Sequence, residues 1–118
     1  MEYVNLVLMG ILILFLAQRF IPTKGVRHIT TDELKKLIKN KNIQFVDVRT
    51  PGEFNQRKIN QFQNIPLHQL AQKANALSKE KETIVICQSG MRSNKATKIL
   101  KKLGFKSITN VKGGMSAW

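Results

Sequence analysis

A single cysteine, Cys87, stands where an apolar run meets a polar loop. The run covers residues 83–87, and a helical pattern begins near Ser93. In such an arrangement the backbone N–H groups of residues 88–93 turn toward the sulfur, and amides at a helix N-terminus stabilise negative charge. That environment favours the thiolate, the nucleophilic form of cysteine. The pattern therefore predicts a reactive Cys87 rather than a small buried apolar side chain.

The loop after Cys87 has features that suit an anion. Gly90 permits the backbone angles of a tight cradle, and Arg92 adds a fixed positive charge. Phosphotyrosine-type phosphatases use a similar cysteine loop, but theirs has one more residue before the arginine. The shorter loop favours a smaller target at the thiolate. A terminal sulfur atom taken from an anionic donor is such a target.

Apolar runs and helical periodicities alternate along the rest of the chain. The predicted strands are residues 26–29, 43–48, 83–87 and 107–111. The predicted helices follow a Thr30–Glu33 capping box, follow Pro66, and run from about Ser93 to Leu103. This order predicts a small α/β fold with a mainly parallel sheet and helices on both faces. Sites in such folds form at the carboxyl ends of strands, where Asp47 and Cys87 lie.

The N-terminal segment differs from the remainder. Residues 3–21 are almost continuously apolar, and as a helix they would extend roughly 28 Å, close to the thickness of a bilayer core. We predict an uncleaved transmembrane anchor; a cleavable signal peptide and a buried helix are the alternatives. Basic residues follow the segment and none precedes it, which predicts a single-pass cell-membrane protein with its domain in the cytoplasm. A lone cysteine suits that reducing compartment. The predicted division is residues 1–25 for anchor and linker and 26–118 for the domain.

Charge and composition limit the partners. The formal net charge is +13, from 20 basic and 7 acidic residues. A solvated lysine surface explains it, and at a membrane it would favour anionic lipid. Nucleic acid is not an expected partner, because one tyrosine and one tryptophan provide no aromatic–basic stripe. His28 and His68 have no partner at metal-ligand spacing, so neither a metal nor a cofactor is predicted.

After the apolar segment, the chain resembles a single-domain rhodanese, a member of the thiosulfate sulfurtransferase family. The resemblance covers roughly residues 26–118 and is most specific in the loop from Cys87 to Ser93. Matching motifs occur in family order: Asp47-Val48-Arg49 with Glu53-Phe54, Asn64-Ile65-Pro66-Leu67, Cys87-Gln88-Ser89-Gly90-Met91-Arg92-Ser93, and Gly113-Gly114 with Trp118. The resemblance implies the rhodanese fold.

The resemblance also implies a two-step reaction. The Cys87 thiolate takes the outer sulfur of a small anionic donor such as thiosulfate, and cyanide or a thiol then removes it. The implied substrate-binding residues are those of the loop: Gln88, Ser89, Gly90, Met91, Arg92 and Ser93. Asp47 and Arg49 are supporting residues. With no second cysteine to resolve the persulfide, the thiol acceptor must be an external partner.

Smaller expectations concern the carboxylates. Asp47 either orients the loop, by accepting hydrogen bonds or pairing with Arg92, or caps its strand. Arg49 and Glu53 are expected to form a structural pair.

The stretch from Lys58 to Phe62 departs from the His-Ile-x-Gly-Ala pattern of many family members.

Two other functions remain open at this stage. A binding or regulatory module of the same fold would need no thiolate. A cysteine phosphatase is disfavoured by the length of the loop.

Overall fold

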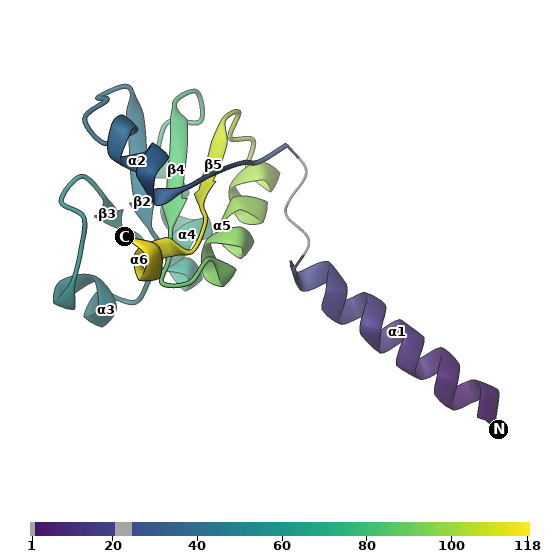
Figure 1. Ribbon diagram of the computed structural model, residues 1–118. Coiled ribbons are helices and arrows are strands. Elements are labelled where there is room, and N and C mark those ends of the chain that lie inside the picture. The colour runs from purple at the N-terminus through teal and green to yellow at the C-terminus, as the bar shows by residue number, and fades with distance from the viewer. Residues whose placement is uncertain (1, 21–24) are drawn as a thin grey trace.

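The computed structural model describes residues 2–20 and 25–118 (Figure 1). The first helix, α1 (Glu2–Phe20), stands clear of the other elements in Figure 1, and its large apolar side chains from Tyr3 to Leu16 are exposed. The predicted anchor extends to residue 21, which lies outside the described residues. Among those described, no helix is both long enough and apolar enough to cross a membrane. The prediction of a transmembrane anchor is therefore not supported.

The remaining elements build a parallel five-stranded sheet in the order β1-β5-β4-β2-β3. The strands are β1 (Arg27–Ile29), β2 (Ile43–Asp47), β3 (Gln63–Asn64), β4 (Glu82–Ile86) and β5 (Ile108–Val111). The four predicted strands are confirmed with small changes at their ends. The short edge strand β3 was not predicted, because two residues carry no alternation of apolar and polar side chains.

Helices cover both faces of the sheet, as predicted. They are α2 (Thr31–Leu37), α3 (Pro51–Gln56), α4 (Leu67–Lys73) with the following 3₁₀ turn η1 (Ala74–Ala76), α5 (Met91–Lys102) and α6 (Gly114–Ala117). One apolar cluster joins Leu70 of α4 and Leu100 of α5 to Val85 of the sheet. A second, on the other face, joins Leu34 of α2 and Met115 of α6 to neighbouring strand residues. Successive strand side chains point to opposite faces, so buried strands supply both clusters.

Two helices begin with the same capping arrangement. In α2 the Thr30 hydroxyl accepts from the backbone N–H of Glu33, whose carboxylate accepts from the N–H of Thr30, which confirms the predicted capping box. In α3 Thr50 and Glu53 repeat it, with Pro51 at the first helical position. The second box stabilises the start of the six-residue helix α3 and fixes the position of Glu53.

The stretch that departs from the family pattern contributes to the core. Ile59 and Phe62 are both buried, and the Phe62 ring centroid lies 5.1 Å from that of Phe45 on β2. The Phe62 side chain thus packs against β2 in the core, where the alanine of the family pattern would bury much less apolar surface.

Candidate active site

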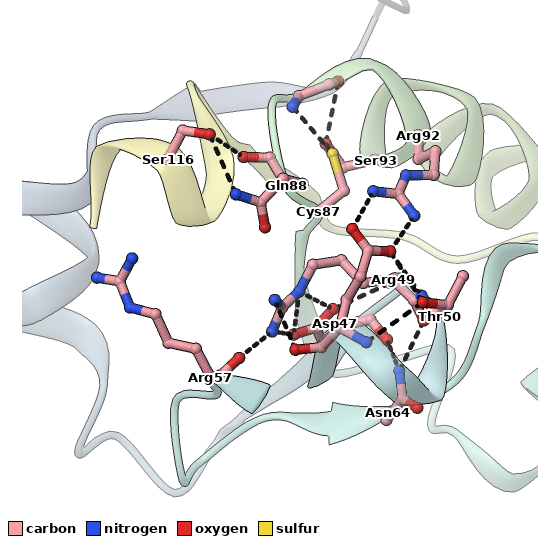
Figure 2. A network of polar contacts seen from close by, with 12 residues as sticks. Asp47, Arg49, Thr50, Arg57, Asn64, Cys87, Gln88, Arg92, Ser93 and Ser116 are labelled. Carbon is pink, nitrogen blue, oxygen red and sulfur yellow. Dashed lines mark hydrogen bonds and ion pairs between the residues drawn. The ribbon is translucent and has the colours of Figure 1, made fainter. Parts of the chain in front are cut away.

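The thiol of Cys87 is held by its own loop. Cys87 follows β4 and is fully buried. The Gly90 N–H donates to Sγ at 2.9 Å, and Sγ lies 3.3 Å from the hydroxyl of Ser93, which in turn donates to the Gly90 carbonyl (Figure 2). Gly90 has φ +102°, a left-handed conformation that glycine adopts without strain. Among the described residues, the amide that reaches the sulfur is that of Gly90, so the predicted cradle is narrower than a full ring of amides.

Arg92 forms an ion pair with Glu53, not with Asp47. Its two terminal nitrogens donate to the two carboxylate oxygens at 2.6 and 2.9 Å, a forked pair linking α5 to α3 (Figure 2). The hydrogen bonds from Arg92 lower the pKa of the Glu53 carboxyl to about 2, and Glu53 raises the pKa of Arg92. Both groups are therefore charged at neutral pH, and the pair holds Arg92 beside the cysteine loop.

Asp47 and Arg49 form a separate, buried pair. Both Asp47 oxygens accept from the Arg49 guanidinium, the shortest contact being 2.7 Å. Arg49 also donates to the backbone carbonyls of Glu53 and Arg57. Of the two alternatives for Asp47, the cap at the strand end is confirmed, because Asp47 Oδ1 accepts from the backbone N–H of Arg49 at 3.0 Å, and the pairing with Arg92 is wrong. Arg49 contacts the backbone of Glu53 rather than its carboxylate. Arg49, held by Asp47, thus contacts the backbone of α3 at Glu53 and the residue just after the helix, Arg57. This position of α3 places the Glu53 carboxylate beside Arg92.

The C-terminal glycines clamp the loop from the other side. The N–H groups of Met115 and Ser116, at the start of α6, donate to the carbonyls of Cys87 and Gln88 at 2.8 and 2.9 Å. Gly113 and Gly114 have φ +74° and +55°, a left-handed conformation that favours glycine, and a Cβ at Gly114 would collide with the backbone of Cys87 and Gln88. The double glycine is therefore a backbone requirement of the cysteine loop.

The other loop residues point away from the sulfur. The side-chain amide of Gln88 donates to the Ser116 hydroxyl, and the backbone carbonyl of Gln88 accepts from the same hydroxyl (Figure 2). Ser89 is exposed, and Met91 is 64% exposed at the tip of the loop. Of the predicted substrate-binding residues, the structure thus gathers Gly90 and Ser93 at the sulfur, holds Arg92 nearby through Glu53, and leaves Ser89 and Met91 facing outward.

Two hollows flank the Glu53–Arg92 pair. One, of about 320 Å³, is polar and is lined by Arg49, Glu53, Gln56, Arg57 and Gln88. The other, of about 410 Å³, lies between α4 and α5 and includes Arg92 in its wall. Within the described part of the chain no group of three or more His, Cys, Asp or Glu side chains is placed to hold a metal ion. The chemistry that the geometry offers is that of a thiol nucleophile beside a guanidinium.

Sequence reasoning missed three contributors to this site. Glu53 was expected to pair with Arg49, but it pairs with Arg92. The sequence Thr50-Pro51-Gly52-Glu53 is a recognisable start of a helix and could have shown where Glu53 lies. The carbonyl contacts of Met115 and Ser116 carry no signal in side-chain type, because backbone N–H groups make them.

Comparison with known proteins agrees with this geometry. A family model described as the rhodanese-like domain matches residues 30–118. The protein YtwF of Bacillus subtilis is 38% identical over 94 residues, which cover 79% of this chain and 90% of YtwF. A protein of Allochromatium vinosum named sulfurtransferase is 30% identical over 79% of this chain and 88% of its own length. A rhodanese-like domain protein from Staphylococcus aureus has a crystal structure that superimposes with a TM-score of 0.73 at 36% identity, covering 79% of this chain and 91% of that one.

Proposed function

We propose, for a chain that belongs to the rhodanese-like family, that Cys87 carries a sulfane sulfur atom from an anionic donor such as thiosulfate to an external thiol or to cyanide. Relatives named as sulfurtransferases support sulfur transfer in general. The observation that carries the proposal is the contact between the Gly90 N–H and the Cys87 sulfur, beside the arginine of α5. A cysteine that served only as an apolar core residue would not need a backbone N–H directed at its sulfur.

The proposed reaction has two steps. In the first, the Cys87 thiolate attacks the outer sulfur of thiosulfate, the S–S bond of the donor breaks, and sulfite leaves. In the second, an external nucleophile attacks the terminal sulfur of the persulfide and Cys87 leaves as thiolate. The Gly90 N–H is placed to stabilise the charge on sulfur in both steps, whereas the Ser93 hydroxyl accepts from the thiol and donates to the Gly90 carbonyl. Arg92 attracts the donor anion electrostatically while Glu53 holds its side chain.

Two rival functions predict different behaviour. A binding module of the same fold would retain its partner after Cys87 is replaced. A phosphatase would turn over phosphate esters, which the short loop between Cys87 and Arg92 disfavours. Assays with an aryl phosphate and with thiosulfate plus cyanide, run on the same protein, distinguish phosphoryl transfer from sulfur transfer.

The direct test is the intact mass of the protein after brief exposure to thiosulfate. We expect a gain equal to one sulfur atom, reversed by cyanide and absent in Cys87→Ser. Cyanide-dependent turnover should fall to background in the same variant, because the nucleophile is lost. If thiosulfate leaves the mass unchanged while Cys87 is readily alkylated at neutral pH, thiosulfate is not the donor. An inert thiol would contradict the proposal itself and favour the binding module.

We further propose that the domain works attached to the cytoplasmic face of the cell membrane through α1. The support is the run of exposed apolar side chains on α1, from Tyr3 to Leu16, together with the strongly basic composition. Vesicles containing anionic lipid should carry the full chain upward in a density gradient. Leu8→Asp with Leu12→Asp should largely abolish flotation, and Leu8→Met should not. Equal flotation of the aspartate variant would assign the attachment to the basic surface instead.

A further inference from the structure

The outward face of α5 carries a row of basic side chains that begins at the cysteine loop. Residues spaced by four, three and four positions lie above one another on one side of a helix. Here they are Met91, Lys95, Lys98 and Lys102, which we call the α5 stripe. The opposite side of α5 is buried on the sheet through side chains such as Ala96 and Leu100. The stripe therefore points away from the core, and a hollow of about 420 Å³ lies along its first three residues.

The lysines of the α5 stripe are not neutralised within the domain. Helix α5 contains no aspartate or glutamate, and among the described residues its one ion pair is that of Arg92 with Glu53. Like charges one helical turn apart repel each other, so the row of lysines lowers the stability of the isolated helix. The stripe therefore presents an uncompensated positive charge that suits an anionic partner.

The composition of the stripe favours lipid over protein as that partner. Among residues 25–118, Met91 is the one large apolar side chain that is exposed, and it lies at the tip of the cysteine loop. A basic helical face with an apolar side chain at its end suits the boundary between lipid headgroups and acyl chains. Interfaces between proteins, in contrast, are enriched in arginine and aromatic residues and depleted in lysine. The stripe has three lysines and neither of the enriched types.

The chain enters the domain beside the other end of the stripe. Gly25 is the first residue described after α1, and a Cβ built on it would lie 2.7 Å from Lys101 Nζ in the last turn of α5. Because α1 ends at Phe20, the five residue steps to Gly25 extend at most roughly 18 Å. An α1 bound to a membrane therefore keeps the last turn of α5, which includes Lys102, within about that distance of the lipid.

We infer that the α5 stripe lies against an anionic lipid surface, with Met91 among the headgroups, so that the cysteine loop faces the membrane. The inference rests on the proposed attachment of the domain to the membrane and adds which face of the domain contacts the lipid. Each lysine near such a surface should raise the partition coefficient about fivefold, and the three lysines together about 100-fold. The contact should weaken as salt is added, because ions screen the attraction between exposed charges.

Partition of the full chain into vesicles tests the role of the lysines. The vesicles contain phosphatidylcholine with roughly one-third phosphatidylglycerol. The stripe variant carries Lys95→Gln, Lys98→Gln and Lys102→Gln, and its partition coefficient should fall about 100-fold. The matched control carries Lys36→Gln, Lys39→Gln and Lys41→Gln, which remove the same charge from exposed lysines in or just after α2, on the other face of the sheet. The control should lose at most about fivefold. Equal losses in the two variants would overturn the inference and leave an acidic protein surface as the occupant of the stripe.

Methionine methyl groups separate this inference from the proposed attachment through α1. The full chain, with labelled methionine methyls, is bound to nanodiscs of the same lipids that carry a nitroxide at the headgroup. Met9 reports on α1, Met91 on the stripe, and Met115, which is 1% exposed in the core, is the internal control. We expect Met9 and Met91 to lose far more signal than Met115, and added salt to restore Met91 first. Loss at Met9 alone, or equal loss at Met91 and Met115, would overturn the inference and keep the attachment through α1. Loss at Met91 alone would support the stripe and contradict attachment through α1.

Discussion

Replacement of Gly114 by alanine is expected to reduce sulfur transfer by about 100-fold or more and to destabilise the fold by at least about 2 kcal/mol. A Cβ at this position would lie 2.1 Å from the backbone oxygen of Cys87 and 2.9 Å from the backbone carbon of Gln88. Backbone atoms cannot rotate away as a flexible side chain can. The cysteine loop or α6 must therefore move, and either movement breaks the bonds that the Met115 and Ser116 amides make to the loop.

Two other glycines isolate the cause. Gly104 also has a positive φ, +92°, but an added Cβ there meets no heavy atom within 4 Å. Gly104→Ala should cost only the left-handed backbone penalty of about 1–2 kcal/mol and leave kcat/KM unchanged. Gly52, in α3, has neither restriction, so Gly52→Ala should be neutral or slightly stabilising. Urea unfolding and the thiosulfate–cyanide assay on all three variants provide the comparison. If Gly114→Ala behaves like Gly104→Ala, close backbone approach does not hold the loop.

The sheet was predictable because its signal is repeated over several residues. Residues 43–48 and 83–87 are short, mostly apolar runs, and parallel strands buried on both faces have that composition. The placement of Cys87 and Asp47 at carboxyl ends of strands followed from this pattern, whereas the pairing of β2 with β4, which makes those ends neighbours, is a finding of the structure. The helices α3 and α6 were missed because they are short, with six and four residues, and provide little periodicity.

The pairing of charges was not predictable from spacing. Arg49 lies two residues from Asp47 and four from Glu53, so both carboxylates were within reach on the sequence. The choice depends on where β2 ends and α3 begins, because Asp47 is buried at the strand end whereas Glu53 faces the loop of Cys87. Glu53 also completes the Thr50 capping box, which leaves its carboxylate at the start of α3, opposite Arg92. The three-dimensional positions of Asp47 and Glu53 therefore determine which of them pairs with Arg49, and the local sequence does not distinguish them.

Replacement of Arg49 by methionine is expected to cost about 3–5 kcal/mol of unfolding free energy, the usual penalty for removing one partner of a buried ion pair. Asp47 is completely buried and Arg49 is 2% exposed. The variant leaves the Asp47 carboxylate without its counter-ion and the carbonyls of Glu53 and Arg57 without their donor. The matched control is the exposed pair of Lys106 and Glu80, where Lys106→Met should produce little measurable change in urea midpoint.

The double variant Asp47→Leu with Arg49→Met tests what the pair contributes. Removing both charges relieves the unpaired carboxylate, so the double variant should be more stable than the sum of the two single changes predicts. It should not regain wild-type stability, because the carbonyls of Glu53 and Arg57 still lack Arg49. Strictly additive losses, measured by urea unfolding, would contradict direct coupling between the two charges. Because those carbonyls fix α3, the double variant should also release Glu53 from Arg92 and raise KM for thiosulfate more than it lowers kcat. The buried pair is thus expected to act on the thiol only through the position of α3.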